Sequence, residues 1–205
     1  MVEQSRNERG QALTLEGITA AIILLAAIGF ALQMTAVTPL SASTSSQHVE
    51  NQLQSTGEGV LASSDNTGAL EEALLYWNES ESQFQGAGEE SYYRGTSPDN
   101  AFGDALDTSF RDRNVAYNVY IHYHRDDGTM STQRLIDQGQ PSDHAVSASR
   151  TVVLSESDRL VRPDGESGPQ LAELSEGEFY APHLDDESEG SLYNVVRVEV
   201  VAWRI

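Results

Sequence analysis

Two histidines, His122 and His124, are the first residues in this sequence whose types and spacing suggest chemistry. Side chains two residues apart on a strand point to the same face, so two imidazoles could hold a metal ion if a third ligand joined them. No third ligand stands at a matching spacing, and a half-exposed strand face explains the pair more simply. We therefore expect no metal ion and no other cofactor.

Motifs for nucleophilic, phosphate or metalloprotease chemistry are missing from the sequence. It contains no Gly-x-Ser-x-Gly elbow, no glycine-rich phosphate loop before a helix and no His-Glu-x-x-His pair. It also contains no cysteine, which excludes disulfides, thiol catalysis and cysteine-ligated zinc. Serine, histidine and aspartate are plentiful, but their abundance does not fix a geometry. We predict that the protein is not an enzyme.

Asn78 opens an Asn-Glu-Ser sequence, which is the acceptor pattern for N-glycosylation. The pattern is short enough to occur by chance in a chain of this length. It becomes usable only if this part of the chain lies outside the cell, so Asn78 is a candidate glycosylation site whose use depends on the location of the domain.

One long apolar run lies near the start of the chain. Residues 17–32 carry no charge, and the mostly apolar stretch extends over 11–37. About 20 apolar residues cross the hydrocarbon core, and a helix is the only single segment that can do so. The sequence predicts a transmembrane helix over residues 11–38. Glu16 opens the run, and a carboxylate near lipid usually has a partner or lies at the interface.

The residues before the apolar run favour one orientation. Residues 1–10 form a polar leader that carries Arg6 and Arg9, together with two glutamates. Positive charge tends to stay in the cytoplasm. We expect a single-pass protein of the cell membrane, with its N-terminus in the cytoplasm, its C-terminal domain outside the cell and the lipid bilayer as its first partner.

The rest of the chain indicates an α+β domain. Pro39 is expected to end or kink the membrane helix, and residues 39–64 to form a spacer with a weak helix. An external domain over 65–205 follows, with short helices first and an antiparallel sheet after them. Period-two alternation predicts its strands near 115–123, 129–136, 149–154 and 193–205. The stretch 155–191 is predicted to be a long loop.

The net charge of the chain is −20, from 32 acidic and 12 basic residues, and every basic residue is an arginine. An acidic surface of this kind repels phosphate backbones, so nucleic acid is excluded as a partner. Self-repulsion opposes the compact state at low salt, whereas molar salt screens charges over about 3 Å. The composition is typical of a protein adapted to a hypersaline medium.

The N-terminal pattern resembles the type IV pilin superfamily, and in particular haloarchaeal pilin-like membrane proteins. The resemblance rests on Arg9 and Gly10, on Thr14-Leu15-Glu16 at the start of an apolar helix, and on a helix followed by a sheet. It implies a pilin-like fold and a leader peptidase that cuts after Gly10, with Gln11 as the new N-terminus. Glu16 then matches the acidic residue at the start of the pilin helix, one residue further from the cut than in bacterial pilins.

The resemblance implies a structural role. The chain is expected to be a pilin-like or accessory subunit of an archaeal surface filament or of its assembly machine, with other pilin-like subunits as partners along the N-terminal helix. Two alternatives stay open. One is a membrane-anchored binding or sensing domain that does not assemble. The other is a secreted protein released by cleavage near Ser41-Ala42-Ser43, which is a small-residue site after the apolar run.

Overall fold

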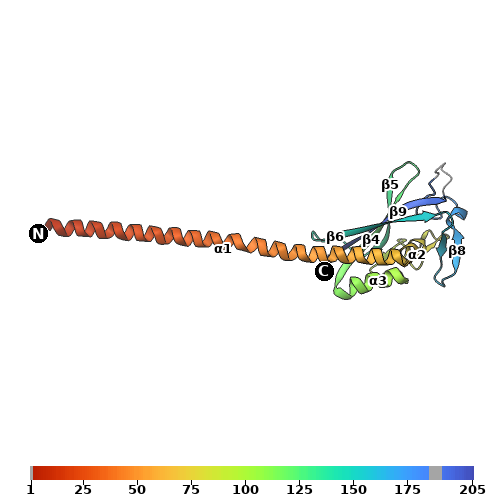
Figure 1. Cartoon of the computed structure of the whole chain (residues 1–205), viewed down its shortest axis with the longest axis horizontal. Helices are drawn as coiled ribbons and strands as arrows, with labels where there is room; N and C mark the ends of the chain where they lie inside the picture. The colour runs from red at the N-terminus through yellow and green to blue at the C-terminus, as the bar shows by residue number, and fades with distance from the viewer. Residues whose placement is uncertain (1, 185–190) are drawn as a thin grey trace. The chain divides into compact units, whose positions relative to one another are not determined.

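The chain divides into two compact units, Met1–His48 and Val49–Ile205 (Figure 1). The structure is a computed structural model that describes the backbone of residues 2–184 and 191–205. Side chains are described for 14–33, 47–184 and 191–205. Helix α1 (Val2–Asn66) runs through the first unit and into the second. The second unit combines short helices with a sheet, so the α+β class predicted from the sequence is confirmed.

Helix α1 does not end at Pro39, where the sequence predicts a break or a kink. Its bounds, Val2–Asn66, include Pro39 and the whole stretch expected to be a spacer with a weak helix. A proline removes one backbone donor from a helix, whereas the serines, alanines and glutamines around it keep theirs. The division between the two units therefore falls inside a helix, after His48, and not in an extended linker.

Two short α-helices follow α1 in the second unit. Helix α2 (Ala69–Leu75) begins after Gly68, whose φ of 79° is a left-handed conformation that glycine adopts without a steric penalty. Helix α3 (Ala101–Ser109) begins after Asn100, whose side chain accepts a hydrogen bond of 2.9 Å from the N–H group of Gly103. This bond satisfies one of the donors that the first turn of a helix leaves open. A 3₁₀ turn, η1 (Arg111–Arg113), leads from α3 into the sheet.

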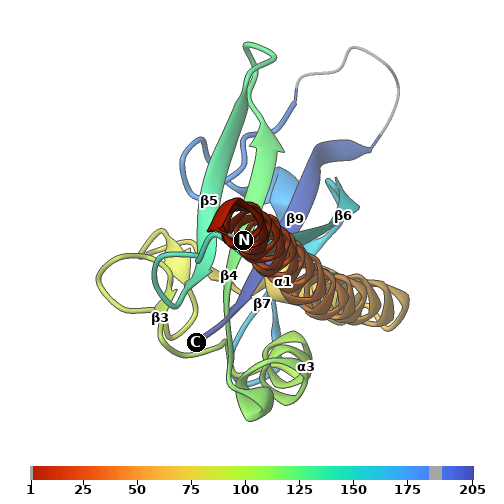
Figure 2. The ribbon, with the colours of Figure 1, turned by 90° about the vertical axis from the view of Figure 1, so that its left-hand side faces the viewer.

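The main sheet has five strands in the order β3-β5-β4-β9-β6 (Figure 2). All neighbouring strands are antiparallel except β3 and β5, which are parallel. The predicted antiparallel strands are thus confirmed in the four long members, and a short parallel strand is added at one edge. The strands are β3 (Tyr93–Arg94), β4 (Val115–His124), β5 (Met130–Asp137), β6 (Val146–Ser155) and β9 (Leu192–Arg204).

The stretch 155–191 is not the plain loop that the sequence predicts. It contains a small hairpin of β7 (Arg159–Val161) and β8 (Ser167–Gln170), followed by the 3₁₀ turn η2 (Leu171–Glu173). A second small hairpin, β1 (Trp77–Asn78) with β2 (Gln83–Phe84), lies earlier in the chain. The indole Nε1 of Trp77 donates a hydrogen bond of 2.7 Å to the carbonyl of Glu178, which ties the stretch to the domain.

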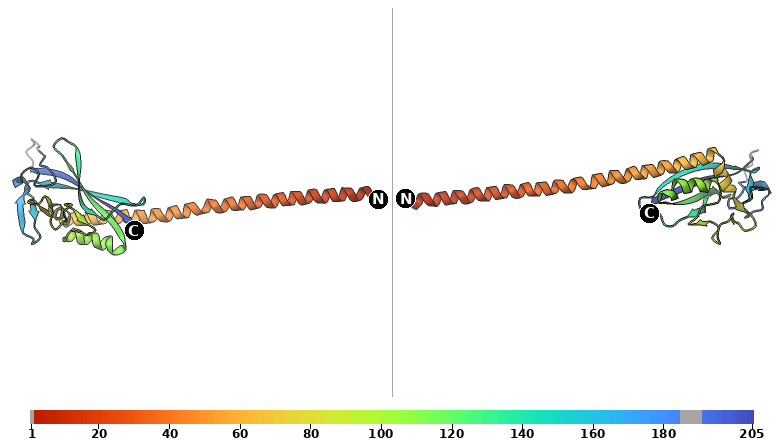
Figure 3. Two further views of the ribbon diagram at one scale, coloured as in Figure 1. Left: turned by 180° about the vertical axis from the view of Figure 1, so that it is seen from behind. Right: turned by 90° about the horizontal axis from the view of Figure 1, so that it is seen from below.

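Helices cover one face of the main sheet. Figure 3 shows α3 and the last turns of α1 on the same side of it. Gly57 lies in close contact with the sheet, because a Cβ atom built there would lie 3.0 Å from the Cβ of Ala148 on β6. The last turn of α1 is also held by an ion pair between Asp65 and Arg150 of β6, with an N···O distance of 2.6 Å. A bulkier residue at position 57 would push helix and sheet apart.

We expect Gly57→Val to lower the free energy of unfolding by about 1–3 kcal/mol, because its methyl groups would overlap Ala148. Gly59→Val is the matched control: Gly59 lies in the same helix, is exposed and has no neighbouring atom within 4 Å of a built Cβ. Its effect should stay within about 0.5 kcal/mol. Denaturant unfolding of the two variants measures the difference, and equal losses would contradict the close contact.

A hydroxyl–carboxylate network joins α3 to the sheet. The Oη atom of Tyr117 on β4 donates a hydrogen bond of 2.6 Å to Oδ1 of Asp107 on α3. The Oγ atom of Ser97 donates to the same oxygen at 2.7 Å, and Nε of Arg111 lies 3.3 Å from it. Burial, together with the bond to Asp107, raises the pKa of the Tyr117 phenol well above its usual value of 10. The folded protein therefore keeps a proton here that the unfolded chain loses above about pH 10.

We expect Tyr117→Phe to cost about 1–2 kcal/mol of unfolding free energy at pH 8, because Ser97 and Asp107 lose a buried partner. Above pH 10 the wild type should lose about 1.4 kcal/mol per pH unit at this group, whereas the variant has no phenol there to ionise. The difference in unfolding free energy between the wild type and Tyr117→Phe should therefore become smaller between pH 8 and pH 11, as measured by urea titrations. Tyr120→Phe, which removes a phenol from the opposite side of the same strand, is the control. If the difference in unfolding free energy between the wild type and Tyr117→Phe did not change with pH, the raised pKa of Tyr117 would be refuted.

Candidate functional site

The apolar segment Thr14–Gln33 of α1 is the strongest functional candidate in the chain. It is long and apolar enough to cross a membrane, with a mean hydropathy of 2.2, and none of it is buried. Leu15 and Leu25 are 71% and 69% exposed. A segment of this kind also occurs in signal sequences, so length and composition establish only that it can span a bilayer. No other helix in the described part of the chain meets the same criteria.

Glu16 is the one charged residue of this segment. Its side chain is exposed, one turn before Ala20 and next to Gly17. Gly17 and Gly29 have no atom within 4 Å of a built Cβ, so both leave the helix surface open to close approach by another helix. The hydroxyl of Thr19 donates a hydrogen bond of 2.8 Å to the carbonyl of Leu15, which satisfies this polar group within the helix.

The predicted processing site at Gly10 and Gln11 lies within the bounds of α1. The side chains of both residues lie outside the part of the chain for which side chains are described. The structure therefore does not test cleavage after Gly10, and the processing site stays a prediction from the sequence.

Asn78 lies at the end of β1, at the rim of an open hollow of about 320 Å³. Its Oδ1 atom accepts hydrogen bonds from the backbone N–H groups of Ser80 (3.0 Å) and Glu81 (3.3 Å). The carboxylate of the neighbouring Glu79 pairs with Arg162 at 3.1 Å. The amide of Asn78 is thus held by its oxygen in a tight turn at the surface, a geometry compatible with attachment of a glycan to its nitrogen.

His122 and His124 lie on the same face of β4, as their spacing predicts, but the structure gives His122 partners within the protein. Its Nε2 lies 2.9 Å from Oε2 of Glu199 on β9, and its Nδ1 lies 2.9 Å from the hydroxyl of Thr132 on β5. Among the residues described, no group of three histidine, cysteine, aspartate or glutamate side chains is placed to hold a metal ion. The sequence could not identify Glu199, because it lies on a distant strand.

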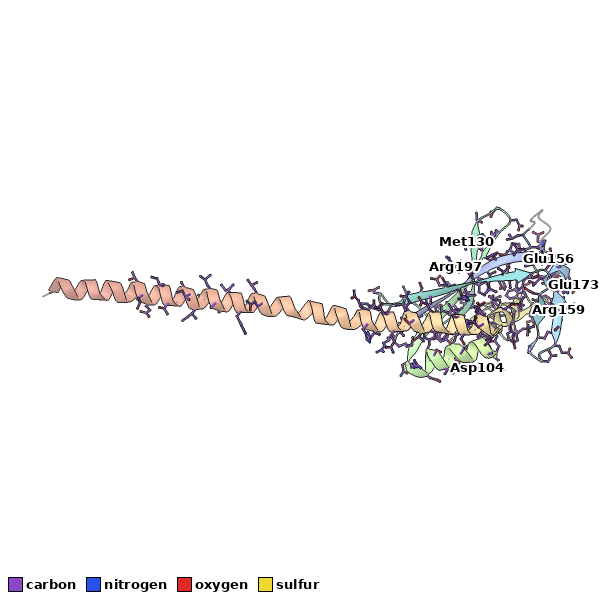
Figure 4. The ribbon with its side chains drawn as sticks, viewed as in Figure 1. Asp104, Met130, Glu156, Arg159, Glu173 and Arg197 are labelled. Carbon is purple, nitrogen blue, oxygen red and sulfur yellow. The ribbon has the colours of Figure 1, made fainter. Side chains whose placement is uncertain are left out.

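The face of the sheet opposite the helices carries side chains from all four long strands. Figure 4 shows Met130 and Arg197 on the side of the second unit away from Asp104 of α3. Met130 is 50% exposed and Val153 is 60% exposed. The strand registers place the following exposed or partly exposed residues on this surface, which we call the open face: Tyr120, His122, His124, Met130, Thr132, Arg134, Asp137, Ser147, Ser149, Thr151, Val153, Val195, Arg197, Glu199 and Val201.

An aromatic hollow of about 400 Å³ lies between the β4–β5 turn and residues 176–182. Tyr123 and Tyr180 line it, and Asp126 and Asp127 stand at its rim. The ring of Phe179 lies 4.1 Å from that of Tyr180, so the aromatic wall is continuous. Nearby, burial and the negative charge of Asp126 raise the pKa of Tyr193 to about 12. The hollow combines aromatic rings with acidic groups and one basic residue, Arg125.

Comparisons with known proteins give a family but no function. No curated protein matches the chain, and no solved structure matches it. One protein-family model matches residues 9–202, which is nearly the whole chain. The matched region includes the apolar segment of α1 and the five-stranded sheet except the last two residues of β9. The chain therefore belongs to the family described as "Family of unknown function (DUF7288)".

Proposed function

We propose that the protein is a membrane-anchored structural subunit, pilin-like in organisation, of an archaeal surface filament or of the machine that assembles one. In this proposal the segment Thr14–Gln33 crosses the membrane and packs against the same segment of neighbouring subunits. The domain from Val49 onward lies outside the cell and makes the contacts there. The observation that carries the proposal is the complete exposure of a bilayer-length apolar helix.

The free-energy cost of leaving the hydrophobic side chains of this segment in water supports the proposal. Nine large hydrophobic residues between Leu15 and Leu32 are exposed in the structure. Each contributes about 1.5–3 kcal/mol when it leaves water, so together they amount to more than about 10 kcal/mol. The whole folding free energy of a domain is about 5–15 kcal/mol. A helix with this composition therefore needs lipid or other apolar helices around it.

Glu16 favours assembly over simple anchoring. A carboxylate at the edge of the hydrocarbon region is costly unless it is paired. If the leader is removed after Gly10, the new α-amino group of a neighbouring subunit is a suitable partner. Gly17 and Gly29 lie on the same segment and allow the close helix contacts that such a pair requires.

A membrane-tethered binding domain is the competing function. The aromatic hollow beside Tyr123 and Tyr180 favours it, because apolar rings with acidic groups at the rim suit a cationic or amphipathic ligand. Both functions need the same anchor. The mature N-terminus and the behaviour of Glu16 distinguish them.

The first experiment identifies the mature N-terminus in the native host. We expect the chain to stay in the membrane fraction after an alkaline carbonate wash, and its intact mass to correspond to a start at Gln11. A Gly10→Val variant should keep the leader and show the mass of the uncleaved chain. A start at Met1 in the wild type would favour the simple anchor, and a start near Thr44 would mean secretion. A chain that the wash releases with its apolar segment intact would refute the proposal.

The second experiment tests Glu16. We expect Glu16→Gln to leave membrane retention unchanged and to lower the yield of sheared filaments at least tenfold, because removal of one partner of a buried ion pair costs about 3–5 kcal/mol. Glu8→Gln is the matched control, because Glu8 lies in the leader that cleavage removes. Normal filament yield from Glu16→Gln would contradict the role given to this carboxylate.

A further inference from the structure

The open face differs from the rest of the second unit in its exposed apolar side chains. Met130, Val153 and Ile205 are the large hydrophobic residues that stay exposed among the described residues of Val49–Ile205. Two of the three, Met130 and Val153, lie on the open face, at opposite edges of the long-stranded part of the sheet. Two exposed apolar side chains at opposite edges do not form an apolar patch by themselves, so the case for a contact surface depends on the charges and the size of the face.

Charge also distinguishes the open face. The chain carries a net charge of −20, yet the acidic residues of this face, Glu199 and Asp137, are balanced by Arg134 and Arg197. Glu199 is held by His122, and Arg134 by Asp137 at 3.0 Å. Two copies of so acidic a protein repel each other wherever carboxylates face carboxylates. The open face is a surface through which they can approach without that repulsion.

Arg197 and Glu199 make this face complementary to itself. They stand two residues apart on β9 and point to the same side of the sheet. Arg197 is exposed, and no ion-pair partner for it lies within residues 14–33, 47–184 and 191–205. In a two-fold arrangement residue i of one copy meets residue j of the other, and j meets i. Arg197 of each copy can then reach Glu199 of the other.

The size of the face suits a contact that works together with a membrane anchor. Four strands spaced about 4.8 Å apart, each about eight residues long at 3.3 Å per residue, cover about 500 Å² per copy. Two such faces bury about 1,000 Å², which is the lower limit for a specific interface. The small side chains of Ser147, Ser149 and Thr151 on β6 leave room for a second sheet at about 10 Å.

We propose that the open face is the contact surface between two copies of this chain, packed sheet against sheet about a two-fold axis, with Arg197 and Glu199 exchanging ion pairs across it. The inference rests on the proposed function only in that anchored copies share one membrane and so meet at high local concentration. A second copy of the chain then covers the face of the sheet that the helices leave open.

The experiment uses the absence of cysteine from the chain, which makes single-cysteine cross-linking specific. Thr151→Cys is introduced on the open face, and Thr108→Cys, which is also exposed but lies on α3, is the control. The full-length variants are treated in native membranes with a bismaleimide that spans about 10 Å, the expected spacing of packed sheets. We expect a covalent dimer from Thr151→Cys at least tenfold more abundant than from Thr108→Cys.

A charge exchange then tests the pairing. In the Thr151→Cys background, Arg197→Glu alone and Glu199→Arg alone should each lower the dimer yield at least tenfold, because like charges then face each other. Co-expression of the two variants with different tags should restore cross-linking, and only between the two tags. A residue that merely supports the fold would give no such restoration.

The outcomes separate this inference from the proposed function. Equal dimer yields from Thr151→Cys and Thr108→Cys, in a chain that stays in the membrane, would overturn the open-face contact and leave the anchored subunit standing. An adduct of Thr151→Cys with a different protein would overturn the choice of a second copy as partner. A chain released from the membrane would refute the proposed function. The same cross-linking experiment on the released chain would then still show whether two copies contact each other through the open face.

Discussion

The close contact between α1 and β6 at Gly57 is the constraint on which the second unit depends. It sets the distance between the helix and the sheet, and the ion pair between Asp65 and Arg150 holds the last turn of the helix in the same place. With one face of the sheet covered in this way, the side chains of the core are excluded from water and the other face is left for contacts. Gly57 thus lets the helix lie close to the strand on the face of the sheet that holds the core.

The amphipathic strands were predictable because their signal is local. Val119 and Ile121 alternate with Tyr120 and His122, and a period of two needs no knowledge of the rest of the fold. The pairing order was not predictable, since β9 inserts between β4 and β6 although it is separated from both along the chain. The short strands β1, β2, β3, β7 and β8 also escaped prediction, because two to four residues carry no period that can be recognised.

Among the candidate sites too, those that depend on local sequence were predictable, and those that depend on contacts between distant residues were not. The apolar segment was evident from composition alone, because its length and lack of charge do not depend on tertiary structure. The partners of His122 were not evident, because Glu199 and Thr132 come from two other strands and meet it only through the sheet register. The continuation of α1 through Pro39 was missed for a related reason: helix formation is cooperative, and long helical flanks can outweigh one unfavourable residue.

The position of β9 affects how the protein is made. The central part of the sheet is incomplete until residue 204 has been synthesised, because β6 has no neighbour in the main sheet other than β9. The apolar segment, in contrast, is complete after residue 33 and can partition into a bilayer while the remaining chain is still being translated. Late placement of a central strand therefore keeps the main sheet open until nearly the whole chain has been synthesised, long after the apolar segment is complete.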